Sequence, residues 1–404
     1  MFITFWLLVC WIALGTVAVG AEVDARFPAI GSIGLHAPRA ADKYPCVFYR
    51  REDIDAARRR CRNARYKEAV KNLDELANEA SKITLEPLDR TWWDQVKSKP
   101  WRDTYPIIYE KTSRQPGRLA RPAYYAALRA AVRHSKADVK AAKRILLHLS
   151  TYTFEYEHYD VGMNYAGWGI LALHAYDLLG DEFTEEERVV MDKFFTRMAR
   201  AVLKNDIYWI KNDIGGGLNN HLAWHKMILG TLGLFYRRDD LVQYALRGPR
   251  GMQSLLDDGL VDDGLWRESS LTYHFTAIVP MVYLAEAMAH SGYATSLYTL
   301  ETPSGRSLRQ AFDSMFGVLF PDGTIPPIGD TYGIRRKLSD EFCYYYAYRQ
   351  PAISRSALCM AAAAGTSNAS GIALRGARGR RRGNTAGRHA FVSRAWFGTT
   401  PSVP

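Results

Sequence analysis

Residues 215–236 read GGGLNNHLAWHKMILGTLGLFY, and this stretch decides the fold. Over residues 218–236 apolar side chains recur at three-to-four spacing, which is the period of an α-helix. The three glycines allow a tight loop before the helix, and Asn is a favoured residue at a helix start. The stretch therefore predicts a long apolar helix that opens with the polar side chains of Asn219, Asn220 and His221.

The same helical period recurs along most of the chain, and turn signals separate the helical segments. Residues 180–183, 237–240 and 262–264 have the composition of turns, and no convincing β-alternation precedes Pro321. Many helices with short connections favour an all-α fold of helical hairpins around a common axis. The predicted helices cover residues 63–81, 120–134, 136–156, 165–179, 184–204, 218–236, 269–290 and 306–319.

A second polar helix start lies about fifty residues after the first, where residues 266–274 read WRESSLTYH. Here a carboxylate, a phenol and an imidazole again meet the beginning of an apolar helix. A purely structural interpretation makes Tyr273 a core residue and Glu268 an acid favoured in a first helical turn. The functional interpretation makes Tyr273 a proton carrier, which needs a nearby cation because a free phenol has a pKa of about 10. Arg267, His221 and His274 are the candidates for that cation.

Composition and charge indicate a folded protein with a sizeable core. The chain has 404 residues, of which 48% are hydrophobic and 24% charged, and its net charge is +11. Seven of the arginines follow Ile372 with no acid among them, so the rest of the chain carries only +4. We therefore predict no nucleic-acid partner, and an acidic substrate has to be argued from the site.

The two ends of the chain differ from the middle. Residues 1–21 form an uncharged apolar run that ends in small residues, which predicts a signal peptide and a protein exported to the periplasm or secreted. No stable membrane insertion is expected after cleavage. We predict a helical domain over residues 22–335, a linker or remnant of a second domain over 336–371, and a disordered Arg/Gly-rich tail over 372–404.

Cysteine and histidine spacing gives no sign of a metal or redox centre. Without the leader the chain keeps Cys46, Cys61, Cys343 and Cys359. A disulfide between the first two and unpaired thiols are both consistent with this pattern. His221 and His225 lie four apart on one helical face, but the glutamate of the zinc-protease motif is missing. We expect neither a metal nor a cofactor.

Three motifs in sequence order carry a resemblance to a known family. They are Asn220-His221 at a helix start, residues 268–274 (ESSLTYH), and residues 321–331 (PDGTIPPIGDT). Their order and spacing resemble the heparinase II/III and alginate lyase group of polysaccharide lyases. The resemblance covers roughly residues 44–333.

The resemblance implies an incomplete (α/α) toroid followed by an antiparallel β-sandwich, with a groove that binds a uronate-containing anionic polysaccharide. Only about seventy residues follow Gly333 and they do not alternate like strands, so we expect the sandwich to be largely absent. The resemblance also implies β-elimination, in which the uronate carboxylate is neutralised, the C5 proton is removed and the C4–O bond breaks. Donors that bind the developing enolate more tightly than the ground state lower the barrier.

By position, Asn220 and His221 match the family's carboxylate-neutralising pair. Tyr273 matches the tyrosine that protonates the leaving oxygen and, in syn elimination, also takes the C5 proton. In anti elimination His221 is the base instead. We expect further substrate contacts from groove-lining residues, which are Gln115, Arg118, Arg121, Asn164, Tyr165 and Trp168. Residues beside the two helix starts are expected to add to them, namely Asn219, Arg267, Glu268 and His274.

Other functions stay open at this stage. A helical-toroid glycoside hydrolase would need two carboxylates, and Asp213, Asp262, Asp263 and Glu268 are candidates. A uronate epimerase would share proton abstraction at C5. A catalytically inactive glycan-binding module is a further alternative because the second domain is missing. Oligomeric state is not indicated by the sequence.

Overall fold

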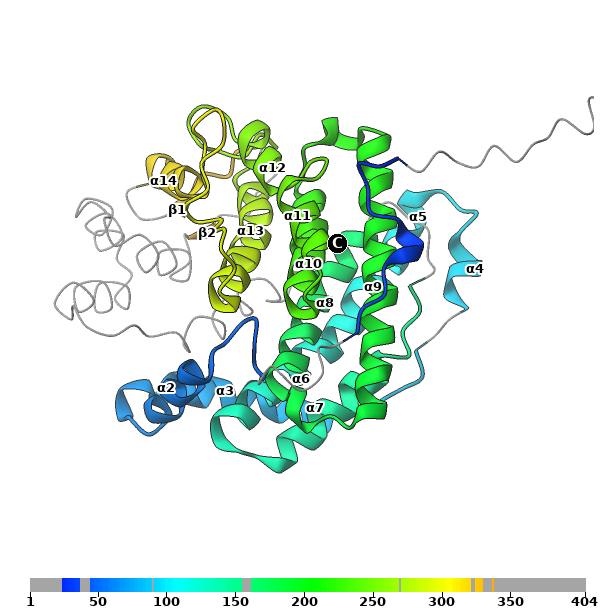
Figure 1. Ribbon diagram of the computed structural model, residues 1–404, viewed down its shortest axis with the longest axis vertical. Helices are drawn as coiled ribbons and strands as arrows, with labels where there is room; N and C mark the ends of the chain where they lie inside the picture. Colours follow the sequence, from blue (N-terminus) through cyan, green and yellow to red (C-terminus); the bar gives the residue numbers. More distant parts are fainter. Residues whose placement is uncertain are drawn as a thin grey trace, which may run out of the picture.

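The computed structural model describes residues 24–36, 44–88, 91–154, 161–268, 270–320, 324–329 and 336–337. The predicted signal peptide, most of the predicted linker and the Arg/Gly-rich tail lie outside these residues. Within them the chain is helical almost throughout (Figure 1). The predicted all-α toroid is confirmed, and the only strands in the described ranges are β1 (Thr324–Ile325) and β2 (Arg336–Lys337), which pair antiparallel.

The helices follow one another with short connections. In chain order they are η1 (Ile30–Ser32), α2 (Arg51–Cys61), η2 (Ala64–Tyr66), α3 (Lys67–Lys82), α4 (Trp92–Val96), α5 (Trp101–Tyr109), the π-helical turn η3 (Glu110–Arg114), α6 (Gln115–Arg133), α7 (Lys136–Leu149), α8 (Val161–Leu179), η4 (Gly180–Glu182), α9 (Glu185–Lys211), η5 (Ile214–Gly217), α10 (Asn220–Tyr236), α11 (Asp239–Arg247), α12 (Met252–Gly259), α13 (Leu271–Ser291) and α14 (Leu308–Val318).

Helices α6, α8, α10 and α13 run parallel and form the inner layer. On α6 and α8, Gly117 lies against Trp168 and, further along both helices, Tyr124 lies against His174. On α8 and α10, Tyr176 contacts Phe235. On α10 and α13, the Trp224 indole donates to the Thr276 carbonyl at 3.0 Å, and Gly230 lies against Leu284. The starts of α8, α10 and α13 therefore lie at one end of the toroid.

The outer helices α9 and α11 run the opposite way, so α8 with α9 and α10 with α11 form hairpins. Along α9, Phe195 stacks on Tyr176 while Asn205 reaches Gly162 near the start of α8. Along α11, Val242 and Ala245 pack against Gly233 and Gly230 of α10. Figure 1 shows α8, α9, α10 and α11 side by side through the middle of the molecule.

Local sequence explains where the helices begin. Thr184 caps α9 through a reciprocal pair of bonds with Glu187, at 3.3 and 2.8 Å. The three glycines of residues 215–217 all have positive φ, between 62° and 69°, so they make the left-handed loop that the sequence predicted before α10. Asn219 then caps α10, since its Oδ1 accepts from the Leu222 N–H at 3.3 Å.

Some of the expected elements are wrong in extent. The helix predicted over residues 136–156 ends at Leu149, where Ser150, Thr151 and Thr153 favour non-helical backbone over a further turn. Residues 237–240, predicted as a turn, lead directly into α11. Cys46 and Cys61 do not form a disulfide, and the Cys46 thiol lies 3.4 Å from the Asp177 carboxylate.

No helix of the described residues is long and apolar enough to cross a bilayer.

Candidate functional site

The starts of α10 and α13 are tied together by one carboxylate. Glu268, three residues before α13, accepts from the Asn220 backbone N–H at 2.8 Å and from the Asn220 amide at 3.0 Å on both carboxylate oxygens. It also accepts from the Trp266 indole N–H at 2.7 Å. Two residues predicted from separate motifs, Asn220 and Glu268, are thus direct partners. The amide of Asn220 is held in one orientation by this contact.

His221 lies in the same first turn of α10 and is shielded by an aromatic ring. The Trp209 indole stacks on its imidazole with ring centroids 4.3 Å apart and the planes 20° apart. The pKa of His221 is lowered to about 3, because burial disfavours the imidazolium and neighbouring His225 adds to the effect. At neutral pH His221 is therefore an uncharged imidazole, which can donate one hydrogen bond and accept another.

A buried charge cluster lies one turn below His221. The Asp206 carboxylate of α9 accepts from Lys226 Nζ at 2.6 Å and from the Tyr244 hydroxyl, and it lies 3.4 Å from the His225 imidazole. Asp206, His225 and Lys226 have no exposed side-chain surface. Lys226 also sits 3.7 Å from the Tyr244 ring centroid. Because removing either charge would leave the other buried alone, this cluster fixes α9 against the first two turns of α10.

Tyr273 occupies the first turn of α13 and is half-buried. Ser270 caps this turn: its Oγ accepts from the backbone N–H groups of Thr272 at 3.1 Å and Tyr273 at 3.4 Å. Since Glu268 ties the approach to α13 to the start of α10, Tyr273 and His221 belong to the same end of the toroid.

His274 is a structural residue rather than a substrate contact. Its side chain is completely buried. Its Nδ1 accepts from the Trp266 backbone N–H at 3.0 Å, which leaves Nε2 as the protonated nitrogen that donates to the Ala311 carbonyl at 3.0 Å. Burial lowers the pKa of His274 to about 4, so it does not supply the cation expected beside Tyr273.

Arg267 is the remaining candidate for that cation. Its side chain is exposed, and it makes no side-chain hydrogen bond or ion pair with the residues that the structure describes. Of the three suppliers expected from the sequence, His221 and His274 are neutral at pH 7, which leaves the guanidinium of Arg267. A positive charge next to Glu268 is thus available to an acidic ligand at this end.

The three residues predicted on α6 follow the π-helical turn η3. Gln115 is half-buried, and Arg118 is exposed but forms an ion pair with Glu110. The Arg121 guanidinium lies 6.0 Å from the Tyr125 ring centroid. Thr112 anchors the π-helical turn. Its hydroxyl accepts from the Asn164 amide at 2.8 Å, and its backbone carbonyl accepts from the Trp168 indole N–H at 2.9 Å.

The residues predicted on α8 are core residues. Asn164 is 8% exposed, and its amide donates a hydrogen bond to the Thr112 hydroxyl. Tyr165 and Trp168 are 0% and 1% exposed. Phe154 packs against both rings, at 5.0 Å from Tyr165 and 5.9 Å from Trp168. The Tyr165 and Trp168 rings fill the aromatic core and Asn164 anchors the π-helical turn, so we propose no substrate contact for these three residues.

Asn219 is likewise occupied by the protein. Besides capping α10, it donates from its amide to the Ile214 carbonyl at 3.0 Å, and its side chain is buried. Asn219 is therefore a helix cap, as its position before an apolar helix predicted.

The carboxylates considered for a hydrolase have local partners. Asp262 lies 2.7 Å from Arg306, and Asp263 accepts from the Leu265 backbone N–H at 3.0 Å within the turn that precedes Trp266. Glu268 is engaged by Asn220 and Trp266, and Asp213 begins the loop before α10 in the left-handed region. No arrangement of two carboxylates facing each other emerges among these described residues.

Sequence reasoning missed the residues that support the site from α9. Trp209 lies on α9, and nothing in the sequence spacing links it to His221, on which it stacks. Lys226 did offer a signal, since a single lysine inside an apolar helical run predicts a buried acidic partner. That partner, Asp206, lies twenty residues earlier and is found only in the fold.

Comparison with known proteins gives a family match for part of the chain and a solved structure of similar fold. Residues 150–319 match the family model described as Alginate lyase. Among solved structures, an alginate lyase from Bacteroides ovatus shares 14% sequence identity, with a TM-score of 0.54 over 86% of this chain and 99% of that chain. This structural likeness supports the fold. A search of curated protein sequences finds no match to the chain.

The family match over residues 150–319 supports a polysaccharide lyase. Within that class the resemblance to the alginate lyase group, predicted from three short motifs, is confirmed.

Proposed function

We propose that this chain cleaves a uronate-containing anionic polysaccharide by β-elimination, at the end of the toroid where α8, α10 and α13 begin. The observation that carries the proposal is the tie between Asn220 and Glu268, which holds the starts of α10 and α13 together. Helix starts present partial positive charge, so several of them at one end favour an anionic ligand.

In this proposal Asn220, His221 and Arg267 engage the uronate carboxylate. Neutralising that group acidifies the C5–H, because negative charge moves into the carboxylate as the proton leaves. Glu268 is a positioning residue, because its carboxylate accepts from the Asn220 amide and orients it. The charge of Arg267 then serves the substrate. The neutral state of His221 supports hydrogen bonding rather than simple charge pairing.

Tyr273 carries the protons. As the C5–H bond breaks, the electron pair forms the C4–C5 double bond and the C4–O bond breaks. The phenol gives its proton to the leaving oxygen. In syn elimination the same tyrosine, as phenolate, first takes the C5 proton. In anti elimination His221 accepts that proton through its unprotonated ring nitrogen, and the stereochemistry of the uronate decides between the two.

Export belongs to the same proposal. The apolar run over residues 1–21 supports cleavage of a leader and delivery to the periplasm or the medium. N-terminal sequencing of the protein recovered from cell fractions tests this: an intact Met1 would contradict it.

The reaction is tested by incubating the purified chain with alginate, heparan sulfate, chondroitin and hyaluronan. We expect ultraviolet absorbance of the conjugated uronate to grow together with new reducing ends on at least one polymer. Reducing ends without this absorbance would show hydrolysis instead. Binding to a polymer without any cleavage would show a binding module.

A further inference from the structure

Trp209, near the end of α9, takes no part in the proposed proton transfers, yet its indole covers one face of the His221 imidazole. The two ring planes are 20° apart and the centroids 4.3 Å apart, and Trp209 is 5% exposed. A histidine ring turns about its last side-chain torsion in a broad, roughly two-fold well, so the helix backbone alone does not fix the plane of the imidazole. The stacked indole does fix it, because turning the ring would break the contact.

The stack occupies a face of the imidazole and not its edge. Both ring nitrogens lie at the edge, where they donate and accept in the plane of the ring. A fixed plane therefore fixes the directions in which His221 can donate to a uronate carboxylate or accept a C5 proton. This matters for the rate, since a group held in a productive geometry reacts faster than one that must be ordered in each turnover.

A buried ion pair sets the position of the indole along α10. Asp206 precedes Trp209 by three residues, so both side chains lie on the same face of α9. The Asp206 carboxylate accepts from Lys226 Nζ of α10 at 2.6 Å, and neither side chain of this pair has exposed surface. The ion pair and the ring stack are two contacts between the same helices, so sliding α9 along α10 would break both.

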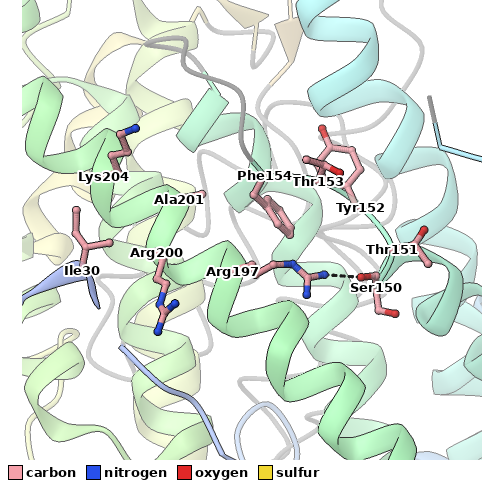
Figure 2. A pocket seen from close by; sticks show the side chains of 10 residues that line it. All are labelled: Ile30, Ser150, Thr151, Tyr152, Thr153, Phe154, Arg197, Arg200, Ala201 and Lys204. Atoms are coloured by element: carbon pink, nitrogen blue, oxygen red, sulfur yellow. Dashed lines mark hydrogen bonds between the residues drawn. The ribbon is translucent and has the colours of Figure 1, made fainter. Parts of the chain in front are cut away.

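The outward side of α9 is held as well. Arg197 donates to the Ser150 carbonyl at 2.6 Å, as Figure 2 shows. Arg200, three residues further on, donates to the Ile33 carbonyl at 2.9 Å. Since α9 is bonded on both sides, it presents the Trp209 indole from an element that is itself held in place.

We propose that Trp209 is a positioning residue of the elimination reaction, which holds the plane of the His221 imidazole by stacking on it. The inference deepens the proposed function and rests on it for the role of His221. Trp209 acts through His221 and does not touch the reacting atoms.

The test compares Trp209→Phe with Trp209→Leu. Phe keeps a ring for the stack, whereas Leu fills much of the space without one. Trp209→Met is a second variant without a ring, in case Leu prevents folding, because the flexible Met side chain fills irregular gaps. Trp92→Leu is the matched control, since Trp92 is also buried, at 3% exposure, and lies on α4. Melting temperatures check that each variant is folded.

We expect Trp209→Leu to lower kcat about tenfold or more, with KM within about twofold of the original, because the ring plane matters as the proton moves. Trp209→Phe should keep at least about a third of the original kcat, and Trp92→Leu should stay within about twofold of it. An unchanged kcat in Trp209→Leu, or an equal loss in Trp209→Phe or Trp92→Leu, would overturn the proposal. A loss confined to KM would also overturn it, since it would make Trp209 a sugar contact.

The ring protons of His221 report the stack without turnover, in spectra of the histidine-labelled protein. They are assigned by their loss in His221→Gln. An aromatic ring shifts protons that lie over its face to lower frequency, so these signals should move to higher frequency in Trp209→Leu and stay near their original place in Trp209→Phe. Signals that do not move in Trp209→Leu would overturn the proposal.

The two readouts separate this inference from the proposed function. If the original chain cleaves no uronate polymer, the proposed reaction fails, while the ring signals still decide whether Trp209 holds the His221 imidazole. If the original chain and Trp209→Leu cleave equally fast, only the role of Trp209 fails.

Discussion

At the scale of single residues, the account depends on Glu268. One carboxylate accepts from the backbone and side chain of Asn220 and from the Trp266 indole, so its removal affects both helix starts. A partner that is held in place reacts faster than one that must be ordered during each turnover. In the proposed reaction Glu268 therefore acts through Asn220.

We predict that Glu268→Gln lowers kcat about tenfold, a change of about 1.4 kcal/mol in the barrier, with a smaller effect on KM. Gln keeps one acceptor oxygen and loses the other. Adding Glu268→Ala to Asn220→Ala should cost little further activity, because Glu268 acts through Asn220. Steady-state kinetics on the cleaved polymer measure both effects. Fully additive losses would contradict the positioning role.

His274 gives the protein a dependence of stability on pH. Its pKa falls from an ordinary value near 6.5 to about 4, because burial disfavours the charged ring. The unfolded chain therefore binds a proton below pH 6.5 that the folded chain does not. The contribution of neutral His274 to the free energy of unfolding is fully present above pH 6.5 and is lost as the pH falls toward 4.

From this shift we expect His274 to account for about 2 kcal/mol of lost stability between pH 7 and pH 5. Urea unfolding of the original chain and of His274→Gln at both values measures it. Gln does not titrate, so its loss over this interval should be smaller by about that amount. An equal loss in both proteins would exclude His274 as the cause.

The sequence did not show which residues at the helix starts face a ligand. Asn164, Tyr165, Trp168 and His274 stand at the predicted helix starts, and all of them are buried. Periodicity places a residue on a helix, but burial at the first turn depends on what packs above it. For Trp168 this neighbour is Phe154, in a segment that the sequence analysis had predicted to be helical.

At the scale of elements, close approach of three helices depends on Gly162. Near the start of α8, a Cβ here would lie 2.5 Å from both Asn205 Oδ1 and His225 Nε2. These atoms come from α9 and α10, so the glycine permits the contact that brings three helices together. Only a residue without a side chain fits this junction.

We predict that Gly162→Ala destabilises the protein by about 1–3 kcal/mol and lowers activity, because the added methyl overpacks this junction. Gly167→Ala is the matched control on the same helix: nothing lies within 4 Å of its Cβ, and Ala favours a helix by about 1 kcal/mol over Gly. Thermal unfolding should therefore separate the two variants in opposite directions. A stable, active Gly162→Ala protein would contradict the proposed packing.

Long apolar helices were the predictable elements. Helices α8, α10 and α13 are apolar over several turns, and helical period alone located them to within a few residues. Helices α11 and α12 are short, and α11 opens with Asp239 and Asp240, which have the composition of a turn. Their stability comes from packing on α10, which no local signal carries.

At the scale of the whole molecule, the toroid turns distant motifs into one site. The two segments that resemble the family are about fifty residues apart, and parallel packing of α10 and α13 brings their starts together. The sequence predicted this convergence through a family resemblance, since periodicity does not say which helices are neighbours. No family resemblance pointed to the buried pair of Asp206 and Lys226, so the sequence did not predict it.

The account's central claim is that this end of the toroid eliminates a uronate bond through Tyr273. The most direct test is the rate at which conjugated unsaturated product forms with the original chain, with Tyr273→Phe, and with Tyr208→Phe as a control, since Tyr208 is half exposed on α9. We predict a rate at least about 100-fold lower for Tyr273→Phe, with unchanged polymer binding, and a rate within twofold of the original for Tyr208→Phe. Product formation by Tyr273→Phe at the original rate would contradict the claim.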